Sequence, residues 1–153
     1  MWSDLPHRLV LSWGWRRAAV AFVAGAASAL AMPPFGVFPV LFLTLSVLVW
    51  LLDGTEAAGG RLAAMASAAV VGWCFGFGYF VAGLWWIGAA FLVDAADFAW
   101  MMPFAVVALP AGRALFHATG LALARLVWPR GPARVLALAL GLGAAEWLRG
   151  HIL

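Results

Sequence analysis

The chain has 153 residues, of which 67% are hydrophobic and 10% charged, and its mean hydropathy is +1.03. This composition excludes an ordinary soluble domain and indicates an integral membrane protein. Its formal charge of +3 comes from nine arginines scattered between apolar runs, which argues against a nucleic-acid partner. The single cysteine, Cys74, excludes an intrachain disulfide, and the sequence has no metal-ligand spacing and no cofactor motif.

The first apolar region, residues 18–52, contains no charged side chain. As one helix these residues would extend about 52 Å, at about 1.5 Å per residue, whereas the hydrocarbon core of a bilayer is about 30 Å thick. Pro33 and Pro34 provide a break, because proline removes a backbone donor and restricts the residue before it. The pattern therefore predicts two spans, residues 18–32 and 37–52, joined by a tight turn that ends at Gly36.

Three further apolar runs predict three more spans. The polar insert 53–61 ends the second span, and Trp85 and Trp86 end the third span as interfacial aromatic residues do. An acidic segment with Asp94 and Asp97 precedes the fourth span. The expected ranges are residues 62–87, 100–126 and 135–153, with Pro103 and Pro110 in the fourth and a turn at 128–132 before the fifth.

We therefore predict an all-α fold, an integral membrane bundle of about five transmembrane helices. The expected organisation is a cytoplasmic N-terminal segment, residues 1–17, followed by a transmembrane domain, residues 18–153, with no soluble catalytic domain. Loops on one predicted side carry seven arginines and the opposite loops carry none, so the positive-inside rule places the N-terminus in the cytoplasm. These arginines are Arg8, Arg16, Arg17, Arg61, Arg125, Arg130 and Arg134.

The segment around Arg16 and Arg17 also imitates a signal peptide, because an apolar stretch and Ala29-Leu30-Ala31 follow it. The apolar sequence resumes at once and four more spans follow, so we interpret this segment as the first transmembrane helix.

Few ionisable residues lie inside the predicted spans. Arg113 is well inside the fourth, where it could face a lipid phosphate, a carboxylate such as Glu146, or the bundle interior. His117, one helical turn further along, shares its face, but two residues do not make a proton pathway. Glu146 and Arg149 are three residues apart near the end of the fifth span and can pair with each other. Arg113, Glu146 and Arg149 are therefore candidates for a site-shaping or structural role.

Two features of the third span suggest packing rather than chemistry. Cys74 lies between Trp73 and Phe75, with no base nearby in sequence, so we expect an inert, packed thiol. Gly72 and Gly76 have the small-xxx-small spacing that lets helix backbones approach closely, with Gly83 on the same face.

Four stretches together resemble one family. They are "ALAMPPFGVFPVLFLTL", "GWCFGFGYFVAGLWWIGAAF", "ARLVWPRG" and the final "AAEWLRGHIL". In this order and spacing the chain is similar to the N-terminal membrane region of bacterial apolipoprotein N-acyltransferase, and the resemblance covers essentially the whole chain. It implies a multi-pass protein of the bacterial inner membrane that completes lipoprotein maturation. The implied partners are a membrane phospholipid as acyl donor and an apolipoprotein as acceptor, without metal or cofactor.

The resemblance also implies a reaction. Family members move an acyl chain from phospholipid onto a cysteine thiol, and then onto the α-amine of an N-terminal diacylglyceryl-cysteine. They use a nitrilase-like domain with a Glu-Lys-Cys triad that follows the N-terminal membrane helices. This chain contains no lysine, and Cys74 does not match the nucleophile. We therefore expect no catalytic residue in these 153 residues, an inactive fragment, and a final polar cluster that leads toward a missing region.

Two other functions remain alternatives. One is a small membrane transporter subunit, which only Arg113 and His117 favour, since the chain shows no inverted repeat. The other is a non-enzymatic membrane scaffold, for which the Gly72 and Gly76 face would be the docking surface.

Overall fold

The computed structural model describes residues 14–57, 59–93 and 95–152, and these residues form helices and turns without a strand. The predicted all-α fold class is confirmed. Arg8, Asp94 and Leu153, like most of the expected N-terminal segment, lie outside the described residues. In chain order the elements are α2 Trp15–Ser28, η1 Ala29–Ala31, α3 Val40–Asp53, η2 Gly54–Ala57, α4 Arg61–Leu84, α5 Ile87–Ala90, α6 Ala95–Phe98, η3 Ala99–Met101, α7 Met102–Leu126 and α8 Arg134–Ile152.

Three of the described helical segments are long and apolar enough to cross a membrane: Arg61–Leu84, Ala99–Leu126 and Arg134–Ile152. Helices α2 and α3 have 14 residues each, which corresponds to about 21 Å of helix. The 3₁₀ turns η1 and η2 extend their ends. A bundle of about five spans therefore stays a prediction for α2 and α3.

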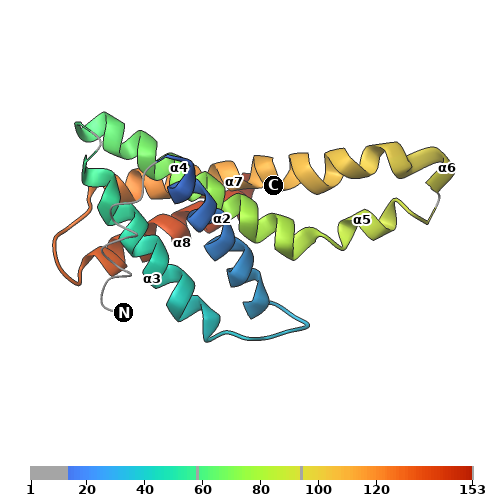
Figure 1. Ribbon diagram of the computed structural model, residues 1–153, viewed down its shortest axis with the longest axis horizontal. Coiled ribbons are helices and arrows are strands. Elements are labelled where there is room, and N and C mark those ends of the chain that lie inside the picture. Colours follow the sequence, from blue (N-terminus) through green and yellow to red (C-terminus); the bar gives the residue numbers. More distant parts are fainter. Residues whose placement is uncertain (1–13, 58, 94, 153) are drawn as a thin grey trace.

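Helices α4 and α7 form the long axis of the molecule. They pack against each other as an antiparallel pair, with α5 and α6 at the far end of the hairpin (Figure 1). Helix α2 packs on α4, α3 on α2, and α8 on α7. The buried core lies where these helices meet, and includes Leu48, Leu51, Val71, Leu121 and Leu138.

The helix ends follow the prolines and aromatic residues. Helix α3 begins at Val40, later than the expected residue 37, and Pro39 is its N-cap residue. Helix α4 ends at Leu84, and a turn at Trp85 and Trp86 precedes α5, where the sequence predicted a span that continues to residue 87. Pro103 lies in the first turn of α7, where a missing backbone donor costs nothing.

Glycines set the separation of the helices. A Cβ atom at Gly72 would stand 2.6 Å from the carbonyl oxygen of His117, and one at Gly76 would stand 2.9 Å from the His117 Cβ. The predicted close packing of this face is therefore confirmed, and its partner is α7 of the same chain. The surface that the scaffold alternative would use for docking is already covered.

A network of polar side chains joins the helices at one end of the bundle. Arg17 donates to the Gly54 carbonyl oxygen at 3.0 Å and to the Ser67 hydroxyl at 3.2 Å. Asp53 accepts hydrogen bonds from the Trp128 indole, at 3.0 Å, and from Arg134. These bonds connect α2, α3 and α4 with the α7–α8 connection, which explains why arginines far apart in sequence gather at one end.

The position of the loop arginines at one end of the bundle predicts a membrane topology that can be tested. Reporters fused at Gly59 should be located in the cytoplasm and reporters fused at Ala95 in the periplasm, because the loop arginines lie at the same end of the bundle as Gly59. An alkaline phosphatase and a fluorescent-protein reporter at each site would check the assignment. Periplasmic activity at Gly59 would contradict it.

Candidate functional site

A cavity of about 170 Å³ lies where all five long helices meet, on the side of the core away from the arginine-rich end. Its walls are mostly apolar, and its polar groups come from α2, α4, α7 and α8. The lining residues are Ser28, Leu41, Leu45, Phe75, Tyr79, His117, Leu142 and Glu146.

His117 is the most enclosed ionisable side chain of the cavity. It is 5% exposed, and aromatic rings surround it, with the Phe80 ring edge-on at 5.4 Å and the rings of Phe75 and Tyr79 at 6.5 and 6.4 Å. Its Nε2 lies 3.7 Å from Oε1 of Glu146, and its buried Nδ1 has no hydrogen-bond partner among the described residues. The ring is therefore held by packing, with one nitrogen toward a carboxylate.

Glu146 links α8 to this histidine. Its Oε2 accepts hydrogen bonds from Nη2 of Arg149 at 2.6 Å and from Nε of Arg149 at 3.0 Å. The other carboxylate oxygen faces His117. The expected pair between Glu146 and Arg149 is present, and the carboxylate also reaches α7, so one side chain joins two helices.

On the opposite wall of the cavity Ser28 is hydrogen-bonded to Thr44, which does not itself line the cavity. Ser28 and Thr44 are buried, and their hydroxyl oxygens lie 2.8 Å apart in a hydrogen bond between α2 and α3. Each hydroxyl also has a backbone carbonyl of its own helix within reach, Ala24 for Ser28 and Leu41 for Thr44. Both hydroxyl groups therefore have hydrogen-bond partners within α2 and α3.

Arg113 lies one helical turn from His117 but outside this cavity. Its guanidinium carbon stands 5.5 Å from the centre of the Phe80 ring, a cation–π geometry. It forms no ion pair with a carboxylate in the described part of the chain, and its buried Nε lacks a hydrogen-bond partner there. Phe80 therefore contacts both the Arg113 guanidinium and the His117 imidazole.

The cavity provides polar positions in an apolar setting, without a nucleophile beside a base. Cys74 is partly buried on α4 and packs against the hydrophobic core. Among the residues of 14–57, 59–93 and 95–152, no three side chains of the metal-ligating type come together. The arrangement suits positioning of helices and of a small polar group, rather than covalent chemistry.

Ser28 and Tyr79, which line the cavity, and Thr44, which is hydrogen-bonded to Ser28, were not predicted from the sequence. A signal was present, since Ser28 and Thr44 interrupt the uncharged run 18–52 and Tyr79 is the only tyrosine. Their mutual proximity depends on how α2, α3 and α4 pack, which the spacing within one helix does not reveal.

Comparison with known proteins identifies the family. The apolipoprotein N-acyltransferase N-terminal domain matches residues 24–153. The chain is 56% identical over 151 residues to an apolipoprotein N-acyltransferase of Rhodopseudomonas palustris, covering 99% of this chain and 28% of that protein. It is 59% identical over 145 residues to the Bradyrhizobium diazoefficiens protein of the same name, covering 95% of this chain and 27% of the relative.

A third relative, an apolipoprotein N-acyltransferase of Brucella suis, is 53% identical over 154 residues, which cover 99% of this chain and 29% of that protein. No solved structure matches the chain. The chain thus spans less than a third of the length of the curated relatives, and its apolar helices are those of a membrane protein. With matches of this length and identity, the chain belongs to the apolipoprotein N-acyltransferase family, in the part that forms its N-terminal domain.

Proposed function

We propose that this chain is the N-terminal membrane part of an enzyme that transfers an acyl chain from phospholipid to the N-terminal diacylglyceryl-cysteine amine of lipoproteins. The observation that carries the proposal is the family match over residues 24–153. The relatives are named for that activity. This chain corresponds to about 28% of the length of the Rhodopseudomonas palustris relative. The proposed location is the bacterial inner membrane, which the chain crosses several times.

In this proposal the membrane domain holds the rest of the enzyme beside its lipid-anchored substrates. Fixing both reactants at one membrane surface replaces a bimolecular encounter by a positioned one. Glu146 and Arg149, with His117, would set the position of the last turns of α8 relative to α7. Arg113, above Phe80, would brace the same region of α7 against α4. These residues would position the helices that support the reaction site without touching the reacting atoms.

We further propose that these 153 residues alone do not complete the transfer. The thioester step needs an accessible thiolate, and Cys74 is partly buried against the core. Transfer to an amine also needs a base and a group that stabilises the oxyanion, and the family uses a lysine for that purpose, whereas this sequence contains none.

The experiment joins this chain to the remaining sequence of the Rhodopseudomonas palustris relative, in place of the corresponding segment. The hybrid should transfer a labelled acyl chain from phospholipid to a synthetic diacylglyceryl lipopeptide, whereas the 153-residue chain alone should give no N-acylated product. The relative without its N-terminal segment is the control.

Two outcomes would contradict the proposal. A hybrid that folds in the membrane but makes no product would refute the assigned family role of this chain. Stoichiometric, hydroxylamine-sensitive acylation of the chain alone, lost in Cys74→Ser, would refute the proposed inactivity.

A further inference from the structure

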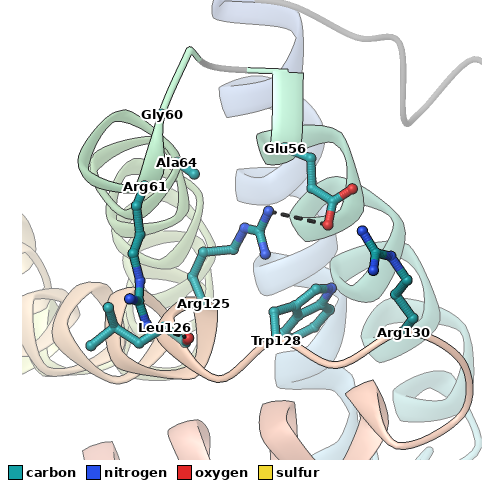
Figure 2. Close-up of a pocket in the computed structure, with 8 residues that line it drawn as sticks. All are labelled: Glu56, Gly60, Arg61, Ala64, Arg125, Leu126, Trp128 and Arg130. Atoms are coloured by element: carbon teal, nitrogen blue, oxygen red, sulfur yellow. Dashed lines mark hydrogen bonds and ion pairs between the residues drawn. The ribbon is translucent and has the colours of Figure 1, made fainter.

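The end of the bundle that carries the loop arginines contains a second cavity, of about 460 Å³. It lies between the start of α4, the end of α7, η2 and the connection to α8. Its lining residues, all labelled in Figure 2, are Glu56, Gly60, Arg61, Ala64, Arg125, Leu126, Trp128 and Arg130. Three arginines and one glutamate line the cavity, which therefore has a formal excess of two positive charges.

The guanidinium groups of this cavity keep most of their donors available. Each arginine has five N–H donors. Arg61 uses one, toward the Leu126 carbonyl oxygen at 3.2 Å. Arg125 donates to the Thr55 hydroxyl at 2.7 Å and stands 3.5 Å from Glu56, whose side chain is 62% exposed. Arg130 is exposed and forms no hydrogen bond or ion pair with the rest of the described chain.

Part of the cavity lining is apolar. Leu126 and Ala64 belong to this part, and the Trp128 indole is fixed by its hydrogen bond to Asp53 at 3.0 Å. Figure 2 shows the side chains of Arg125 and Arg130 on either side of Trp128, both directed toward Glu56. A lining that combines charged with aromatic and aliphatic side chains suits an amphiphilic anion better than a small inorganic one.

The ligand chemistry follows from these donors. Guanidinium groups bind phosphate through paired hydrogen bonds. The N-terminus of α4 also lines the cavity and has no side-chain cap and no acidic residue in its first turn, so its dipole adds to the positive potential. By the positive-inside rule this end lies at the cytoplasmic surface, at the depth of the lipid headgroups.

We propose that this cavity binds a phosphate-bearing anionic headgroup of an inner-leaflet phospholipid, with Arg61, Arg125 and Arg130 as the recognising residues. The site is distinct from the cavity that His117 and Glu146 line, and its proposal does not depend on the proposed function. A bound headgroup would join α4, α7 and the α7–α8 connection, and so stabilise the bundle at its arginine-rich end.

The test measures lipid retention by native mass spectrometry on the whole 153-residue chain in detergent. The probes are phosphatidylglycerol, zwitterionic phosphatidylcholine and inorganic phosphate. Phosphatidylglycerol should be retained in preference to phosphatidylcholine, and inorganic phosphate at equal concentration should not displace it. Arg61→Gln and Arg130→Gln should each lower retention about fivefold, since a basic residue near an anionic lipid contributes about 1 kcal/mol. Glu56→Gln should raise retention, because it removes the only carboxylate that lines the cavity.

Arg16→Gln is the matched control. It removes the same charge at the same end, but Arg16 lies outside the cavity, over the Trp15 ring. Its retention of phosphatidylglycerol should equal that of the unchanged chain. If Arg16→Gln lowered phosphatidylglycerol retention as much as the cavity variants do, the lipid would be attracted only by the net charge of the chain, and the proposed site would be wrong. Displacement by inorganic phosphate would overturn the lipid as its occupant. Arg61→Gln and Arg130→Gln leave the hydrogen bonds of Asp53 intact. The midpoint of thermal unfolding of each variant without lipid verifies that it folds.

Discussion

Replacing Gly25 or Gly120 by leucine should abolish the folded bundle in detergent. A Cβ atom at Gly25 would stand 1.9 Å from the Phe75 carbonyl oxygen, and one at Gly120 would stand 2.3 Å from the Gly141 carbonyl oxygen. Both neighbours are backbone atoms of a packed helix, so the helices α2 and α4, or α7 and α8, would have to move apart. Overpacking by a few methylene groups costs about 1–3 kcal/mol where side chains can adjust. The cost at Gly25 and Gly120 should be larger, because backbone atoms obstruct the new side chain.

The control variants come from the same helices. Gly112→Leu in α7 and Gly143→Leu in α8 place the new Cβ atom where no other atom lies within 4 Å. They should be neutral or stabilising, because leucine favours helix over glycine by about 1 kcal/mol. Thermal unfolding in detergent and the monodisperse fraction in size-exclusion chromatography would check both pairs. Equal losses for all four glycines would contradict a role of close packing.

The packing explains which parts of the fold could be predicted. The uncharged run 18–52 and the prolines that interrupt it were enough to predict an all-α membrane fold and the position of the first turn. The spacing of Gly72 and Gly76 indicated a packed face. Neither feature identified the partner, since a glycine pair fits any close helix. That Gly72 and Gly76 pack on His117 of α7 follows only from the three-dimensional arrangement.

The candidate site was predictable in its charges and not in its contacts. The spacing of Glu146 and Arg149 indicated a pair within one helix, because residues three apart share a face. The contact of Glu146 with His117 joins positions 29 residues apart in the sequence, and depends on the crossing of α7 and α8. Similarly, Arg113 was expected to face a lipid, a carboxylate or the interior, and the structure places it over Phe80, an aromatic neighbour that charge spacing does not indicate.

The pair of Glu146 and Arg149 should behave as a neutral unit near the end of α8. Arg149 lies 15 residues after Arg134 in α8, which corresponds to about 22 Å along the helix, a distance shorter than the thickness of a hydrocarbon core, about 30 Å. Each charge is neutralised by the other through two hydrogen bonds. Glu146→Gln should therefore leave Arg149 without its carboxylate partner, at a cost below the value of about 2.5 kcal/mol for a charge at the centre of a membrane helix.

The double variant distinguishes pairing from separate contributions. Glu146→Gln with Arg149→Gln removes both charges and leaves two amides that can still hydrogen-bond, so its free energy of unfolding should lie closer to that of the unchanged chain than either single variant does. Asp97→Asn, an exposed carboxylate that lines neither cavity, is the control and should be neutral. Unfolding in mixed micelles with increasing dodecyl sulfate would give the free energies of the unchanged chain, the two single variants, the double variant and the control. Additive losses in the double variant would contradict the pair, because independent groups sum whereas a neutralised pair does not.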